Sequence, residues 1–347
     1  MQQTLPKIPL QTTVSVDPAG LSLSLGRDRL LLLGSCFSDS MAEPLANAGF
    51  TLLANPFGTL YNPLSICRCL LRSLDGTPLA DDDMVYHDGL HHSWLHHSRF
   101  SSPDRQRCAE LCNDSIAAAH SFLQDASLVV LTFGTAYVFE LKEGTGDTVV
   151  ANCHKVPASR FVRRLATVDE MACALCSAIE RLRAVNPTLK VLLTVSPIRH
   201  LADGAHGNQV SKATLHLLCN EMQRRCDCHY FPSYEIMMDE LRDYRFYAAD
   251  MLHPSPTAVE ILWRRFVETY VPPVELPQIE SNLRGSRRLL HRPIASYKKC
   301  WTCVAQSSNV DYITTSLPTA VLFSVCTFMK YVPLGTPPRS NCIVQPS

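Results

Sequence analysis

Short apolar runs recur along the chain, and each ends at a turn residue. They are residues 29–33 (RLLLL), 126–133 (ASLVVLTF) and 189–195 (LKVLLTV), followed by Gly34, Gly134 and Ser196. Runs of this length that are apolar on both faces are typical of buried parallel strands. The pattern therefore predicts strands whose carboxyl ends carry polar motifs.

Helical patterns of apolar and polar positions separate these runs. They cover residues 38–48, 101–126, 167–185, 208–225 and 257–270. Strands that alternate with helices at this spacing predict an α/β fold: a doubly wound parallel sheet with flanking helices. Because such sheets bind ligands at the carboxyl ends of their strands, the polar motifs there are the candidates for function.

The last part of the chain has a different character. After a basic stretch near residue 285, Ser, Thr, Pro and Cys dominate without a convincing period. Such composition favours loosely packed structure. Of the 347 residues, we therefore assign 1–293 to one large domain and 294–347 to an atypical, weakly structured C-terminal extension.

Charge and hydropathy exclude several classes of protein. Lys plus Arg and Asp plus Glu both number 32, and this balance argues against a nucleic-acid partner. The most apolar stretch, residues 317–329, is shorter than the roughly 18–20 residues that span a bilayer. The N-terminal residues lack the apolar core of a secretory signal. We expect no membrane partner and a cytoplasmic location.

The chain holds 15 cysteines, an odd number scattered along its length. Disulfide frameworks are typical of short secreted chains with even counts, so we expect reduced thiols. Cys173 and Cys176 have the CxxC spacing of zinc ligands but lie in a helical pattern. We expect both to pack in the core, and we predict no metal site.

The first candidate for chemistry is the stretch GSCFSDS, residues 34–40. A turn from strand to helix exposes a side chain at the sheet edge and directs the free N–H groups of the helix towards it. Ser35 and Cys36 both qualify as a nucleophile there. Alternatively, Ser35 caps the helix and Cys36 is buried.

The second candidate is the D-x-x-H motif of Asp250 and His253. A carboxylate three residues before an imidazole can fold back onto Nδ1, which leaves Nε2 free to act as a base. The motif precedes the last predicted helix. The alternative is an ordinary polar loop.

Together the two motifs resemble the first and last motifs of SGNH/GDSL hydrolases, and further motifs resemble the GSCFA family, which is placed among the SGNH-like proteins. The motifs are GSCF (34–37), NPFGTLYNP (55–63), TFGTAY (132–137), NCHK (152–155), SPIRH (196–200), NQVSKA (208–213), YFPSYEIMMDELRDYRFY (230–247) and DMLHPS (250–255). The resemblance covers roughly residues 10–293 and is specific for the family.

The resemblance implies a nucleophile, His253 as base and Asp250 as its orienting carboxylate. Strict register against G-D-S places the nucleophile at Cys36, and a shift of one residue places it at Ser35. Cys is intrinsically the better nucleophile, and we expect the helix N-terminus and His253 to lower its pKa.

The resemblance also implies an oxyanion hole built from a glycine N–H and an asparagine side chain. Gly58 and Gly134 are the candidate glycines. The chain departs from the pattern at Ala136, where the asparagine is expected, and Asn55 or Asn152 are the candidate substitutes.

Further polar residues are candidates for substrate binding. Asn152, His154 and Lys155 suit an anionic or sugar substrate, but equally a capped turn with solvated neighbours. Arg199 and His200 end the third predicted strand and face either the site or solvent. The histidine-rich run 87–97 suits a metal site, a pocket wall or plain structure.

These observations favour an ester hydrolase or O-acyltransferase that needs no cofactor. Its partner would be a small-molecule or carbohydrate ester, with an acylated carbohydrate as one candidate. The alternative is an inactive member of the fold that binds a carbohydrate or small ligand. The sequence does not define the oligomeric state.

Overall fold

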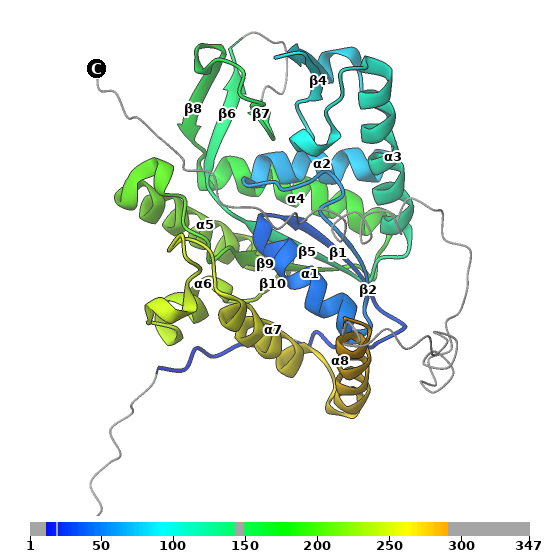
Figure 1. Cartoon of the computed structure of the whole chain (residues 1–347), viewed down its shortest axis with the longest axis vertical. Coiled ribbons are helices and arrows are strands. Elements are labelled where there is room, and N and C mark those ends of the chain that lie inside the picture. Colours follow the sequence, from blue (N-terminus) through cyan, green and yellow to red (C-terminus); the bar gives the residue numbers. More distant parts are fainter. Residues whose placement is uncertain (1–11, 19, 143–148, 291–347) are drawn as a thin grey trace, which may run out of the picture. The chain divides into compact units, whose positions relative to one another are not determined.

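The computed structural model describes residues 12–18, 20–142 and 149–290 (Figure 1). The strands are β1 (Arg29–Gly34), β2 (Thr51–Ala54), β3 (Met84–His87), β4 (Leu90–Ser93), β5 (Leu128–Phe133), β6 (Tyr137–Leu141), β7 (Val149–Val150), β8 (Phe161–Leu165), β9 (Lys190–Val195) and β10 (His229–Tyr230). The helices are α1 (Cys36–Ala48), α2 (Pro63–Asp75), α3 (Arg105–Gln124), α4 (Val168–Val185), α5 (Gly204–Cys226), α6 (Ser233–Glu235), α7 (Pro256–Tyr270) and α8 (Leu276–Leu290).

The central element is a five-stranded sheet in the order β10-β9-β5-β1-β2. All neighbouring strands in it are parallel. The chain runs from β1 outward to β2 and then returns to the other side of β1 at β5. The direction of winding therefore reverses between β1 and β5, and open α/β sheets bind ligands beyond the carboxyl ends at such a point. The predicted α/β fold is confirmed.

Among the described residues there are three hydrophobic clusters, and the two large ones lie one on each face of the central sheet. Alternation along β1 places Leu31 and Leu33 in one cluster and Leu30 and Leu32 in the other. Helices α2, α3, α4 and α5 cover the first face, and α1, α7 and α8 cover the second (Figure 1). All four leucines are at most 2% exposed. Burial of both faces explains why the strand is continuously apolar.

The five predicted helices are all present, with boundaries shifted by a few residues. The first begins at Cys36 rather than residue 38 and ends at Ala48, and its C-cap Gly49 has the left-handed φ of 105°. The helix α4 begins with a capping box in which Thr167 and Glu170 each bond the other's backbone N–H. Such caps supply partners for N–H groups that lack an intrahelical acceptor.

Two small antiparallel sheets were not predicted. Strands β3 and β4 form a hairpin, and β7-β6-β8 form a three-stranded sheet. Figure 1 shows both at the end of the molecule beyond α2. The hairpin turn is Asp88-Gly89, with φ values of 48° and 76°. Positive φ at both central residues is what a tight hairpin turn requires.

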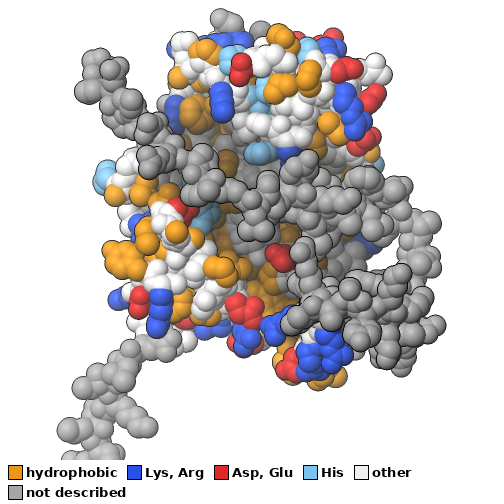
Figure 2. Space-filling model, viewed as in Figure 1, with side chains coloured by type: hydrophobic (Ala, Val, Ile, Leu, Met, Phe, Trp, Pro, Cys, Tyr) orange, Lys and Arg blue, Asp and Glu red, His pale blue; other side chains and the backbone are white. Residues whose placement is uncertain are grey.

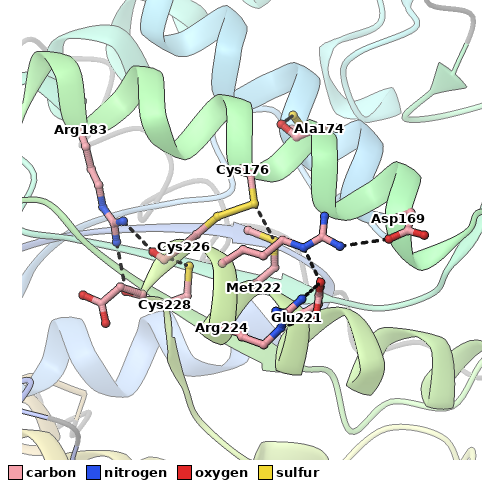
Figure 3. The surroundings of a disulfide bond; sticks show 12 residues. Asp169, Ala174, Cys176, Arg183, Glu221, Met222, Arg224, Cys226 and Cys228 are labelled. Atoms are coloured by element: carbon pink, nitrogen blue, oxygen red, sulfur yellow. Dashed lines mark hydrogen bonds and ion pairs between the residues drawn. A yellow bond between two sulfur atoms is a disulfide. The ribbon is translucent and has the colours of Figure 1, made fainter.

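The expectation of reduced thiols is wrong for one pair of cysteines. A disulfide joins Cys176 in α4 to Cys226 at the end of α5, with their Cα atoms 6.1 Å apart (Figure 3). Beside it, the Arg183 guanidinium donates to the backbone carbonyl of Cys226 at 2.6 Å. The expectation that Cys173 packs in the core is also wrong, because its position on α4 is exposed.

The surface of the described residues mixes acidic and basic side chains, and Figure 2 shows both kinds over the viewed face. This agrees with the balanced composition. Among the described residues, no helix has the length and apolar character needed to cross a membrane. The predicted domain boundary after residue 293 and the extension 294–347 lie outside the described residues.

Candidate functional site

Cys36 is the first residue of α1, directly beyond the carboxyl end of β1. Its side chain is half-buried, and its Sγ lies 3.7 Å from Nε2 of His253. The N–H of the first helical residue has no intrahelical acceptor, so it remains available to a ligand. The fold thus brings together two residues separated by 217 positions in the chain.

Ser35 has a different role from its neighbour. It is 1% exposed, and it is the N-cap of α1, where its Oγ accepts from the N–H of Phe37 at 3.3 Å. Its own N–H donates to the carbonyl of Thr132 at 3.1 Å. The hydroxyl is therefore engaged inside the turn, while the Cys36 thiol faces His253.

Asp250 and His253 form the second half of the group. Asp250 Oδ2 lies 2.6 Å from His253 Nδ1, and Oδ1 accepts from the backbone N–H groups of Leu252 and His253 at 2.9 and 3.0 Å. These hydrogen bonds stabilise the carboxylate and hold the pKa of Asp250 at about 2. A carboxylate that is ionised at neutral pH fixes the ring so that Nε2 faces Cys36.

Burial raises the pKa of the Cys36 thiol, and the carboxylate of Asp39 raises it further. Its own N–H, that of Phe37 and the ammonium of Lys212 act in the opposite direction. The expected lowering is therefore not found, because loss of solvation outweighs the helix N-terminus. The ring nitrogen within reach of this thiol is Nε2 of His253, at 3.7 Å from Sγ.

Asn55 lies beneath this turn rather than at its surface. It is fully buried, its Oδ1 accepts from the N–H of Gly34 at 2.9 Å, and its Nδ2 donates to the carbonyl of Ser35 at 3.5 Å. Burial raises the pKa of the Asp39 carboxyl, and a hydrogen bond with the Asn55 side chain opposes part of that rise. Asn55 therefore supports the Cys36 turn, and its amide is not free for an oxyanion.

The two glycines predicted as oxyanion donors have their N–H groups engaged. Gly58 donates to the carbonyl of Asn55 and Gly134 to the carbonyl of Tyr61, both at 2.8 Å. Ala136, where the family pattern has asparagine, is buried, and its N–H donates to Ser211 Oγ at 2.8 Å. The N–H groups of Cys36 and Phe37 are the backbone donors that act on the thiol.

The structure places Asn152, His154 and Lys155 in a tight turn. Asn152 Oδ1 accepts from the N–H of His154 at 2.9 Å, and His154 and Lys155 have positive φ values of 49° and 60°. The His154 ring is 5% exposed and bonds to Ser98 Oγ and to the Ser93 carbonyl. These contacts favour the capped turn over substrate binding, and Lys155 is solvent-exposed.

Arg199 and His200 follow β9 and lie beside the His253 loop. The Arg199 N–H donates to the carbonyl of Leu252 at 3.4 Å, and the His200 N–H donates to Asn208 Oδ1 at 2.9 Å. Burial and the charges of Lys212 and His253 lower the pKa of His200 to about 4. Its ring packs edge-on against Tyr61, with centroids 5.5 Å apart. The fold therefore brings both residues to the edge that carries Cys36.

The histidine-rich run is mainly structural. His91 and His92 lie in β4, His92 stacks on His154 with centroids 4.4 Å apart, and His96 is fully buried. Within the described ranges, no cluster of three or more His, Cys, Asp or Glu side chains is arranged to hold a metal ion. His97 lies nearer the site: burial and the charge of Arg99 lower its pKa, and the carboxylate of Asp39 opposes that shift.

Sequence reasoning missed two charged residues at this edge, Asp39 and Lys212. Asp39 is in the first turn of α1, one turn beyond Cys36. Lys212 is 1% exposed on the buried face of α5, with Asn208, Ser211 and Leu215. The sequence signal for Lys212 was its position on the helix face that also carries the apolar residues. Lysine is rarely buried on such a face unless its charge has a partner.

A sequence model of the GSCFA family matches residues 29–266. No curated protein matches the sequence.

Solved structures with some similarity include three hydrolases. LAE5, an α/β hydrolase from the metagenome of Lake Arreo, has 10% identity and a TM-score of 0.41 over 72% of this chain and 97% of that chain. Axe2, an acetylxylan esterase from Geobacillus stearothermophilus, has 10% identity and a TM-score of 0.39 over 72% and 96%. A family two carbohydrate esterase from Clostridium thermocellum has 13% identity and a TM-score of 0.35 over 71% and 64%.

The family match spans all the elements that build the site, from β1 to α7. It includes Cys36 at the start of the match and Asp250 and His253 near its end. The chain belongs to the GSCFA family.

Proposed function

We propose that the protein transfers an acyl group from an oxygen ester to Cys36 and then to water or an alcohol. The observation that supports this most strongly is the chain of contacts at the sheet edge. Asp250 Oδ2 is 2.6 Å from His253 Nδ1, and His253 Nε2 is 3.7 Å from Cys36 Sγ. This is the order of carboxylate, imidazole and nucleophile that acyl transfer requires.

Each group has one task in the proposed reaction. His253 Nε2 takes the thiol proton as Sγ attacks the ester carbonyl, and Asp250 stabilises the resulting imidazolium. The N–H of Cys36 donates to the developing oxyanion. His253 then returns the proton to the leaving alcohol. In the second half, His253 activates water or an acceptor alcohol to release the acyl group.

The surroundings favour a polar ester. The charge of Cys36 acts on Tyr61, and His200 packs against the Tyr61 ring, so both residues supply polar groups beside the thiol. An acylated carbohydrate fits this property.

The test is turnover of p-nitrophenyl acetate by the full chain and by three variants, Cys36→Ala, Ser35→Ala and His253→Ala. We expect Cys36→Ala and His253→Ala to lose turnover, and folded Ser35→Ala to retain most of it. Equal rates in all four proteins would contradict the proposal. Loss of turnover in Ser35→Ala alone would assign the nucleophile to the neighbouring serine.

A second candidate is a binding protein that has lost turnover. The engaged N–H groups of Gly58 and Gly134 and the buried Ala136 favour it, because a hole with one donor stabilises an oxyanion less than one with three. Binding of acetylated xylo-oligosaccharide without hydrolysis, unchanged in Cys36→Ala, would support this candidate over the catalytic one.

A further inference from the structure

Lys212 is a lysine enclosed in the fold next to the candidate site. It lies in α5 and is 1% exposed. Its Nζ donates to the carbonyl of Gly134, just after β5, and to the carbonyl of Ser196, just after β9, both at 2.7 Å. Two neutral carbonyls orient an ammonium group without neutralising its charge.

Within the described part of the chain, no carboxylate forms an ion pair with Lys212. The ionisable groups that act on it, or on which its charge acts, are Cys36, Arg199, His200 and His216, and its Nζ lies 5.7 Å from the Tyr234 ring centroid. Arg199 carries a positive charge, and His200 and His216 have lowered pKa values that favour their neutral forms. Of these groups, the thiolate of Cys36 is the anion that forms in the proposed reaction.

The sheet places Lys212 and Cys36 at the same edge. Strands β1, β5 and β9 are neighbours, with Gly34 opposite Thr132 and Phe133 opposite Val195. Cys36, Gly134 and Ser196 follow these three strands at their carboxyl ends. Neighbouring strands lie about 4.8 Å apart, so an ammonium group bonded to the carbonyls of Gly134 and Ser196 lies within electrostatic range of Cys36 Sγ. The protein interior screens this interaction only weakly.

We propose that Lys212 is a positioning residue for Cys36, a buried cation that stabilises the thiolate formed when His253 takes the thiol proton. The S–H bond breaks, the proton moves to Nε2 of His253, and Lys212 keeps its own proton. Lys212 also holds the ends of β5 and β9 in place through its two hydrogen bonds.

The electrostatics of the two groups agree with this role. Burial lowers the pKa of Lys212 to about 7, and Cys36 opposes that shift. In turn, Lys212 is one of the groups that lower the pKa of Cys36 against the effect of burial. A buried cation without a fixed anion is costly to a fold, and a thiolate that forms during the reaction gives it a partner.

The experiment measures how fast iodoacetamide alkylates Cys36 between pH 6 and 11, followed by mass spectrometry of the peptide that contains it. It compares the full chain with Lys212→Met and Lys212→Gln, of which the second keeps hydrogen-bond donors for the two carbonyls. At pH 6, below the Lys212 pKa of about 7, we expect alkylation of Cys36 in the folded variants to slow roughly tenfold, which corresponds to a rise of about one unit in the pKa of Cys36. Above about pH 8, where Lys212 loses its charge in the wild type, the rates of the three proteins should converge.

Two controls belong to this experiment. Lys190→Met removes an exposed charge from the opposite end of β9, and the exposed Cys173 reports on the reagent in every variant. We expect the Cys36 profile in Lys190→Met and the Cys173 profile throughout to stay unchanged. Folded Lys212→Met and Lys212→Gln whose Cys36 profiles match that of the wild type would overturn the inference.

A measurement on the unaltered chain covers the case in which neither Lys212 variant folds. Iodoacetate is an anion and iodoacetamide is neutral. The ratio of the iodoacetate rate to the iodoacetamide rate should therefore be several-fold higher at Cys36, which has a cation nearby, than at Cys173. An equal or smaller ratio at Cys36 would contradict the inference. The inference rests on the proposed role of Cys36 as nucleophile, but the experiment measures ionisation of the thiol. The Lys212 inference can therefore fail in a protein that shows turnover, and it can hold in a protein that shows none.

Discussion

Two regions of the molecule contain histidines, but these histidines differ in their solvent exposure and in their contacts. At the sheet edge, the side chain of His253 is 47% exposed, and its Nε2 faces the Cys36 thiol while its Nδ1 bonds to Asp250. In the layer built on β4, which we call the histidine layer (His92, His96 and His154), each residue is at most 5% exposed. The residue type is the same, and its accessibility and partners are not.

The cause of the difference lies in what each ring contacts. In the histidine layer, His154 bonds to Ser93 and Ser98 and stacks on His92, and burial lowers the pKa of His96 to about 3 and that of His154 to about 4. Such rings stay neutral and hold the fold together. His253 leaves Nε2 facing the thiol that we propose as the nucleophile, which is the arrangement that a catalytic base needs.

The largest expected effect separates the two regions by the same substitution. His253→Ala removes the proposed base, so we expect turnover of p-nitrophenyl acetate to fall by roughly 10²–10⁴-fold. His92→Ala, the matched change in the histidine layer, should leave the turnover of folded protein within about twofold because no reacting group depends on it. Comparable losses of turnover in folded His253→Ala and folded His92→Ala would show that the two regions do not differ in this way.

Asp250→Asn tests the carboxylate behind the base. The amide cannot stabilise the imidazolium and favours the wrong ring tautomer, so we expect turnover to fall on the order of 10²-fold. The loss should be smaller than that for His253→Ala because the base itself remains. Steady-state rates at pH 7 and 9 measure it, and an unchanged rate at both would show that His253 needs no orienting group.

The histidine layer should affect the free energy of unfolding rather than the rate of turnover. Because His154 has a pKa of about 4 in the fold and about 6.5 when unfolded, the unfolded chain binds more protons between these values. The stabilisation is complete above pH 6.5 and is lost as the pH falls to about 4, by up to about 3 kcal/mol.

His154→Gln removes this titration, so urea unfolding at pH 7 and pH 4.5 should show a smaller difference than in the wild type. Turnover at pH 7 is the control, and it should be retained. An equal pH dependence in both proteins would mean that another group causes the acid loss.

The smallest expected effect concerns Ser35. Its hydroxyl caps α1, and replacing a serine cap with alanine costs about 1 kcal/mol. Ser35→Ala should therefore lower the urea midpoint slightly and leave alkylation of Cys36 nearly unchanged. Complete loss of Cys36 reactivity in a folded protein would show that the cap positions the thiol more strongly than its hydrogen bond suggests.

Part of the fold could be predicted because its strands carry a strong signal. β1, β5 and β9 each have six residues and are almost wholly buried. β2 has four residues with partly exposed side chains, and β10 has two, so neither forms a recognisable apolar run. The β3–β4 hairpin had a signal in Asp88-Gly89, but the histidine-rich run around it left a metal site, a pocket wall and plain structure all open.

The site was predictable where contacts are local. Asp250 and His253 are three positions apart, so their spacing alone indicates the hydrogen bond. The choice between Ser35 and Cys36 needed the fold, because it depends on which side chain faces His253. Which N–H groups can serve as oxyanion donors depends on which of them already bond to a carbonyl in a turn. The N–H of Gly58, for example, donates to the carbonyl of Asn55, and the sequence does not reveal such a bond.

The central claim is that Cys36 carries the acyl group. Brief reaction of the full chain with p-nitrophenyl acetate, acid quenching and fragment-level mass spectrometry would locate the acetyl group. The account predicts a thioester on Cys36 that hydroxylamine removes and that Cys36→Ala lacks. Acetyl on Ser35 with Cys36 unmodified would contradict it, as would rapid release of nitrophenol by the Cys36→Ala protein.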